Sequence, residues 1–194
     1  GWGREDGVEI MDRREMAEHF TLDRVSASAA QLNLEKLAWM NGQYLVKTRL
    51  EDLVPLITEE LKAEGVAAES INPDWLGKLV LLEQERLKTI KDFVANTRYF
   101  FTASVEHDPK AVDKVLRKKE NAGFAVVSGL AEAFAGLEEW TAPELEKAAL
   151  AYGEAKAVKI GDLAQPPRVA VTGGTVSRGI WEVLELLGRD RTLA

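Results

Sequence analysis

The sequence predicts an all-α fold, arranged as two consecutive helical bundles. Apolar residues recur at the three- and four-residue spacing of helices, and the period-two alternation of strands is nearly missing. Residues that typically begin or end helices separate these stretches. With 46% of its 194 residues hydrophobic, the chain can bury one large core or two small ones.

Two helices are predicted in the first 47 residues. Asp12 and Glu15 form a capping-box pattern, which predicts a short helix through Met16 and Phe20. Asn33 is the expected N-cap of a second helix. Its apolar positions are Leu34, Leu37, Met40, Tyr44 and Leu45. Large apolar groups at this spacing usually pack, so we expect Trp39 and Met40 to lie in the core.

A third and a fourth helix follow. Thr48 and Glu51 form a second capping-box pattern, and Gly65 is expected to end the helix that they begin. Asn72 before Pro73 predicts the start of one long helix. Its apolar positions are Leu76, Val80, Leu87, Ile90 and Val94.

The later helices have similar start signals. Asp108 before Pro109 predicts a helix that runs into the positive cluster of residues 117–119, which we interpret as a solvated helix face. Gly123 is expected to separate this helix from the apolar stretch 124–137. Thr141 with Glu144 is expected to cap the helix after that stretch.

Composition excludes several kinds of function. The net charge of −7 offers no general attraction to phosphates, so a contact with nucleic acid has to be local. There is no cysteine, and His19 and His107 cannot form a metal site alone, so we expect no metal. No apolar run suits a membrane helix and no signal peptide is recognisable, so we expect a cytoplasmic protein. The absence of an initial Met suggests an excised segment or a processed product.

A glycine-rich stretch, residues 169–180, superficially suggests the phosphate turn of a dinucleotide-binding unit. Ser177 stands where that turn needs its central glycine. The 15 residues after Gly179 are too few for the second strand and the acidic ribose-binding residue. We therefore expect no nucleotide binding there.

Three segments resemble the C-terminal half of bacterial glutamyl-tRNA synthetases. The first is LEKLAWMNGQY at 34–44, preceded by HFTLDRVS at 19–26. The second is RYFF at 98–101, and the third is QPPRVAVTG at 165–173 with GIWEVLELLG at 179–188. The resemblance extends from about residue 8 to the end of the chain.

The resemblance implies a tRNA-recognition module without a catalytic core. The HIGH-type and KMSKS-type signatures, which hold ATP in class I synthetases, do not occur. The helix pattern places a boundary near residues 71–72. The family's plan then implies a stem-contact domain at 1–71 and an anticodon-binding domain at 72–194, whose second subdomain begins near 122. The expected partners are tRNA(Glu) and a catalytic domain in cis. ATP and Mg would belong to that domain, and no cofactor is expected here.

In such synthetases the helix just before the RYFF-like segment carries an arginine that reads the third anticodon base and prefers C to G. Arg86 matches that position. A guanidinium has only donors, which suits the O2 and N3 acceptors of an unpaired cytosine. The alternative is a solvated arginine or an ion pair with Glu83.

Further residues match positions around the first two anticodon bases, namely Arg168, Thr172, Ser177 and Ile180. Arg178 replaces a proline of some relatives and is expected to stack on a base or bind phosphate. Arg168 has a helix-capping or ion-pairing role as its alternative. Asn41, Gln43 and Lys47 are the expected contacts with the tRNA stem.

Three other functions compete with this hypothesis. A non-discriminating synthetase would charge glutamate and glutamine tRNAs alike, and Arg86 weighs against it. A helical scaffold for protein interactions would show no salt-dependent binding of tRNA. An enzyme using the glycine-rich stretch would bind a nicotinamide cofactor.

Overall fold

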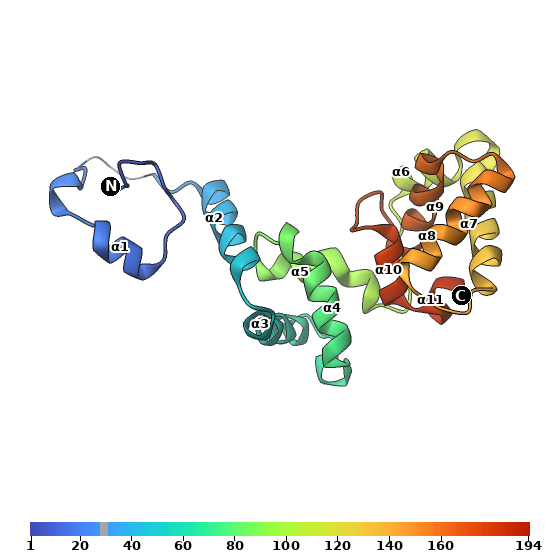
Figure 1. Ribbon diagram of the computed structural model, residues 1–194, viewed down its shortest axis with the longest axis horizontal. Helices are drawn as coiled ribbons and strands as arrows, with labels where there is room; N and C mark the ends of the chain where they lie inside the picture. The colour runs from blue at the N-terminus through green and yellow to red at the C-terminus, as the bar shows by residue number, and fades with distance from the viewer. Residues whose placement is uncertain (28–30) are drawn as a thin grey trace. The chain divides into compact units, whose positions relative to one another are not determined.

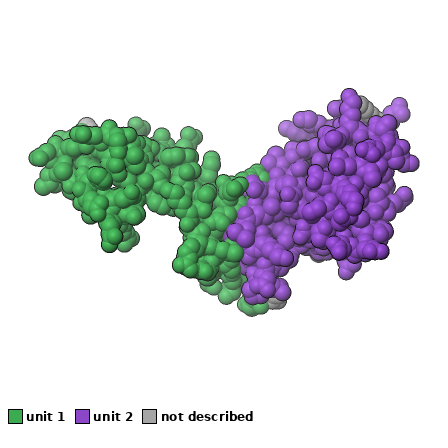
Figure 2. Space-filling view, viewed as in Figure 1, with its two compact units in different colours: residues 1–70, 83–94 green, residues 71–82, 95–194 purple. Residues whose placement is uncertain are grey.

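The computed structural model describes residues 1–27 and 31–194, apart from the side chains of Ser70 and Lys119. Every regular element in these ranges is a helix, which confirms the predicted all-α class. The helices form two compact units, coloured separately in Figure 2. Unit 1 comprises residues 1–70 and 83–94, and unit 2 comprises residues 71–82 and 95–194. Within the described ranges, no helix is both long enough and apolar enough to cross a membrane.

Unit 1 begins with helices whose N-caps are as predicted. The Asp12 side chain accepts a hydrogen bond from the Glu15 backbone (2.8 Å), and the Glu15 carboxylate accepts one from the Asp12 backbone (2.8 Å), at the start of α1 (Arg13–His19). A 3-10 turn, η1 (Leu22–Arg24), follows. Asn33 accepts from the Lys36 backbone (3.0 Å) and begins α2 (Leu34–Lys47).

The third helix, α3 (Leu50–Ala63), does not begin with the predicted capping box. The Thr48 hydroxyl donates instead to the Tyr44 carbonyl (2.9 Å), because Thr48 ends α2. The prediction for Gly65 is confirmed. Gly65 has a positive φ of 82°, and its N–H donates to the Lys62 carbonyl (3.0 Å), which is one of the bonds of a Schellman end. The short turn η2 (Ala68–Ser70) closes the first part of unit 1.

The expectation that Trp39 lies in the core is wrong. Its side chain is 45% exposed, and Met40 is half-buried. The buried positions of α2 are Gly42 and Leu45. A Cβ on Gly42 would lie 3.0 Å from the Leu87 carbonyl oxygen, so the backbone at Leu87 packs closely against the Gly42 side of α2. Helical spacing alone does not show which face a partner covers.

The prediction of one long helix after Asn72 is also wrong, because the chain forms three separate elements there. These are α4 (Pro73–Glu83), the 3-10 turn η3 (Gln84–Arg86) and α5 (Ile90–Thr97). The predicted start is correct, since the Asn72 side chain accepts from the Asp74 backbone (2.9 Å). A new cap explains the break. Asp92 accepts from the Thr89 backbone (2.8 Å), and the Asp92 N–H lies 3.4 Å from the Thr89 hydroxyl.

Unit 2 continues with the 3-10 turn η4 (Arg98–Phe100) and a set of packed helices (Figure 1). Asp108 caps the first of them as predicted, accepting from the Lys110 backbone (2.9 Å). In chain order these helices are α6 (Pro109–Ala111), the π-helix η5 (Val112–Leu116), α7 (Lys118–Ala135), α8 (Ala142–Lys156), α9 (Ile160–Thr172), α10 (Ile180–Leu187) and α11 (Arg189–Leu193). α7 packs against both α8 and α9, and α8 packs against α10.

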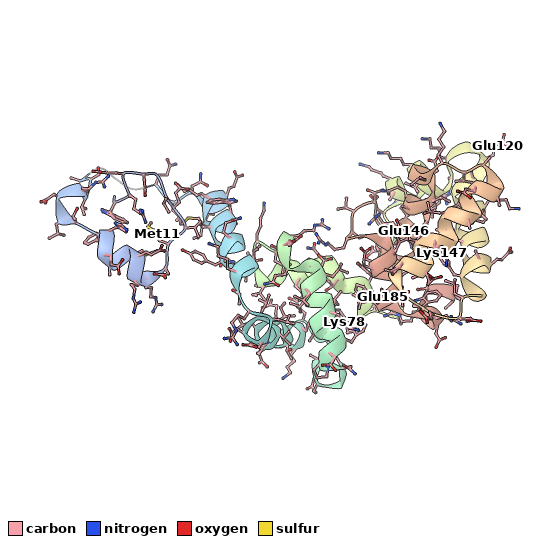
Figure 3. The ribbon with its side chains drawn as sticks, viewed as in Figure 1. Met11, Lys78, Glu120, Glu146, Lys147 and Glu185 are labelled. Carbon is pink, nitrogen blue, oxygen red and sulfur yellow. The ribbon has the colours of Figure 1, made fainter. Side chains whose placement is uncertain are left out.

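Two expectations about this unit need correction. Gly123 does not end a helix but lies within α7. A Cβ there would lie 2.3 Å from the Val115 carbonyl oxygen, so glycine permits close packing of α7 on η5. Thr141 precedes α8 as predicted, but its side chain makes no capping hydrogen bond. The Glu185 carboxylate, labelled in Figure 3, accepts from the Ala142 backbone (2.7 Å) instead.

Candidate nucleic-acid interface

Arg86 is the last residue of η3, in unit 1. Its side chain is exposed, whereas Glu83 is only 1% exposed. The ion pairs found among the described residues do not include Arg86. The guanidinium is therefore available to an acceptor outside the chain.

Gln84 holds the turn that carries Arg86. Its side chain is 8% exposed, and its Nε2 donates to the carbonyls of Leu45 (2.8 Å) and Thr48 (2.8 Å). These carbonyls belong to the end of α2, where a helix leaves acceptors without a full set of helical partners, and the Leu45 carbonyl also accepts from the Thr48 N–H (3.1 Å). One amide thus fixes η3 against α2, and no local sequence pattern marks this residue.

The second group of predicted residues lies in unit 2, around the loop 173–179 between α9 and α10. The Arg168 guanidinium donates to the Ser177 hydroxyl and to the Arg178 carbonyl (2.5 Å). The Thr172 hydroxyl donates to the Arg168 carbonyl (2.9 Å). Arg168, Thr172 and Ser177 therefore form one hydrogen-bonded cluster, in which Arg168 binds the loop.

The start of the loop is anchored to the segment before α6. Gly173 has a φ of 80°, and a Cβ there would lie 2.1 Å from the Glu106 carbonyl oxygen. The Gly173 carbonyl accepts from the Asp108 backbone (2.9 Å). One turn earlier, the exposed His107 ring lies 3.0 Å from the Ala170 carbonyl, to which its Nε2 donates. Backbone contacts therefore determine where the loop leaves α9.

The end of the loop is fixed by the core. Ile180, the first residue of α10, is 2% exposed and packs inside unit 2. Ser177 and Arg178 are half-buried, and the Val176 side chain between Thr175 and Ser177 is 73% exposed. The loop therefore presents a partly covered polar surface with one exposed apolar side chain.

The three expected stem contacts are all on α2, in unit 1. The Asn41 amide donates to the Lys88 carbonyl (2.6 Å), so it also connects α2 to the segment after η3. Gln43 is half-buried and Lys47 is exposed. Asn41 thus has a structural role whatever it contacts outside the chain.

The glycine-rich stretch has no strand. Residues up to Thr172 are the last turns of α9, and Gly173 is the left-handed residue that ends the helix. Within the described ranges, no group of three or more His, Asp or Glu side chains could hold a metal ion.

Comparisons with known proteins show which family the chain belongs to. Residues 45–194 match the family described as Anticodon binding domain. The chain is 36% identical over 195 residues to a glutamate–tRNA ligase of Thermodesulfovibrio yellowstonii, and 36% identical over 194 residues to one of Thermus thermophilus. All of this chain is aligned in both cases, against 41% and 40% of those ligases, so it spans about two fifths of their length.

A solved structure gives the same result. The crystal structure of a glutamate tRNA ligase from Elizabethkingia meningosepticum, in complex with its amino acid, matches with a TM-score of 0.86 and 26% identity. The match covers 100% of this chain and 37% of that ligase. Because the family profile covers 150 of the 194 residues (45 to 194 inclusive), the chain belongs to the anticodon binding domain family.

Proposed function

We propose that this chain is the tRNA-recognition part of a glutamate–tRNA ligase. It binds the stem and the anticodon loop of glutamate tRNA so that a catalytic domain in cis can attach glutamate. The observation that carries the proposal is the family match over residues 45–194, together with the relatives' alignment along the whole chain. ATP and Mg act in the catalytic domain, and the module works in the cytoplasm.

Arg86 selects the third anticodon base. Its exposed guanidinium offers donors to the O2 and N3 acceptors of cytosine. The N1–H and N2–H₂ groups of guanine are donors themselves, so they cannot accept hydrogen bonds from the guanidinium. Gln84 supports this role because it fixes the turn that presents Arg86. Asn41, Gln43 and Lys47 contact the tRNA stem.

The loop 173–179 receives the first two anticodon bases. Splayed bases are recognised by stacking and by hydrogen bonds to their edges. The Thr172 and Ser177 hydroxyls and the loop backbone supply such hydrogen bonds, and the Arg178 guanidinium offers a stacking surface or a phosphate contact. Arg168 positions the loop through its bonds to Ser177 and Arg178.

The test measures binding of the chain to two anticodon stem-loop RNAs of glutamate tRNA. The third anticodon base is C in one RNA and G in the other. We expect the chain to prefer C, and Arg86→Gln to remove most of this preference, a loss of about 1–3 kcal/mol of discrimination. The matched control is Arg14→Gln, on the exposed face of α1. Equal affinity of the unaltered chain for both RNAs would favour a non-discriminating ligase. No salt-dependent binding of either RNA would refute the proposal.

A further inference from the structure

A cavity of about 820 Å³ lies within unit 2, between the η5–α7 junction and the first turns of α9. Its volume is in the range of pockets that hold small organic ligands. Thr175, in the loop 173–179, belongs to its wall. Gln165, one helical turn before Arg168, also belongs to its wall. The cavity therefore adjoins the loop cluster but is a separate space.

The charge of the lining is positive although the chain is acidic. Lys114, Lys118 and Lys159 line the cavity, and Asp162 is the carboxylate among its lining residues. None of these three lysines takes part in the ion pairs found among the described residues. Three exposed ammonium groups around one concave surface attract a compact anion, and lysine commonly binds phosphate as a point charge.

Two further features concern hydrogen bonding at this cavity. The Gln165 Oε1 atom is shielded from solvent and accepts no hydrogen bond from the described residues. A buried acceptor without a donor is costly, and the half-buried Gln165 lines the cavity, so a rotation of its amide would let a ligand N–H or O–H group relieve Oε1. In addition, α9 begins at the cavity, and its N-cap Lys159 supplies no side-chain hydrogen bond to the first turn.

We infer that this cavity binds the phosphate-bearing part of a nucleotide, with the phosphate at the three lysines and a hydroxyl or amino group at Gln165. A nucleotide meets each requirement, because it combines an anion with ribose hydroxyls and base amino groups. The nucleotide comes either from RNA held at the loop 173–179, which rests on the proposed function, or from a free mononucleotide.

Gly161 allows the cavity to be filled without disturbing the core. It lines the cavity in the first turn of α9, and a Cβ there would meet nothing within 4 Å. Gly161→Phe should therefore leave the helix content unchanged while occupying the site. The matched control is Gly136→Phe at the end of α7, where a Cβ also meets nothing within 4 Å.

The lysine variants give a second, electrostatic measurement. Loss of a phosphate contact weakens RNA binding equally for all sequences and reduces the slope of log K against log salt by about 1. We expect this result for Lys114→Ala and for Lys159→Ala, with the preference for C over G unchanged. The control is Lys78→Ala, an exposed lysine of α4 that does not line the cavity (Figure 3).

Two arms distinguish the sources of the nucleotide, and both use the 194-residue chain. In the first arm, Gly161→Phe weakens binding of the anticodon stem-loop about tenfold or more, as expected when the cavity loses its contacts with one nucleotide of the RNA. In the second arm, calorimetry detects cytidine monophosphate bound to the unaltered chain and to Gly136→Phe but not to Gly161→Phe. A positive first arm identifies an RNA phosphate, and a positive second arm alone identifies a free nucleotide.

Unchanged stem-loop affinity in Gly161→Phe, together with no binding of cytidine monophosphate, would overturn the inference. The proposed function would survive that result if Arg86→Gln still removed the preference for C. Conversely, cytidine monophosphate bound at the cavity by a chain that binds no stem-loop would support the cavity and refute the proposed function.

Discussion

At the residue scale, Gln84 has the largest predicted effect on unit 1. Gln84→Leu keeps the size of the side chain but removes the amide donor from the carbonyls of Leu45 and Thr48, and leaves the Leu45 carbonyl with the Thr48 N–H alone. Because these acceptors lie at a buried helix end, we expect the free energy of unfolding to fall by about 1–3 kcal/mol. Urea titration followed by circular dichroism measures the change.

Gln43→Leu is the control for this variant. It makes the same chemical change on α2, at a half-buried side chain for which no hydrogen bond was found in the described ranges. An equal loss of stability in both variants would show that the amide of Gln84 has no special role.

The residues that the sequence predicted correctly have partners close by in the chain. Asp12, Asn33, Asn72 and Asp108 each accept from a backbone N–H two or three positions away, so a local pattern reveals them. Gln84 binds carbonyls 36 and 39 positions away. Arg191, on α11, donates to the carbonyls of Phe100, Tyr99 and Thr102, which are 89 to 92 positions away. No short motif encodes such contacts.

At the element scale, the loop 173–179 depends on one glycine. Gly173→Ala would place a Cβ 2.1 Å from the Glu106 carbonyl, at a φ of 80° that alanine rarely adopts. We expect a loss of about 1–3 kcal/mol in stability, and weaker stem-loop binding because the Arg168 cluster would shift. Thermal unfolding and fluorescence anisotropy measure the two effects.

The neighbouring glycine supplies the control. A Cβ on Gly174 would meet nothing within 4 Å, and its φ is not in the left-handed region. Gly174→Ala should therefore leave both stability and binding unchanged. If it impaired binding as strongly as Gly173→Ala, the loop's sensitivity would reflect its flexibility rather than its anchoring to Glu106.

Element boundaries were harder to predict than element types. Leu87 follows η3, yet it is 1% exposed and occupies an apolar position of the predicted long helix. Because Leu87 is buried although it lies outside a helix, the apolar pattern does not show where the helix ends. The Thr89 and Asp92 pair was the local signal for a new helix start, at the same spacing as Asp12 and Glu15.

At the scale of the whole molecule, net charge and local charge differ. The net charge of −7 argues against indiscriminate binding of phosphates, but three lysines line one cavity. Those lysines are 45 positions apart at most (114 to 159), and only packing of η5 and α7 against α9 brings them together. The all-α class could be predicted from the helical spacing of apolar residues and the lack of period-two alternation. The cavity could not be predicted in this way, because it forms only when the helices pack.

The compact units are interleaved along the chain, which leads to the last prediction. Residues 83–94 belong to unit 1, where Gln84 and Lys88 contact α2. A fragment ending at 71, the boundary expected from the resemblance, lacks both contacts and the Leu87 backbone beside Gly42. We therefore expect fragment 1–94 to unfold at a higher urea concentration than fragment 1–71, because Gln84 of η3 donates hydrogen bonds to carbonyls at the end of α2.

Fragment 1–82 separates this effect from chain length. It adds the residues of α4 up to Leu82 but stops before Gln84, so we expect its urea midpoint, followed by circular dichroism, to match that of fragment 1–71. A midpoint for 1–82 equal to that of 1–94 would show that the added helix, rather than the turn bound to α2, stabilises unit 1. In that case Gln84 could not be the residue that holds Arg86 in place, and the position of Arg86 would have to depend on α4.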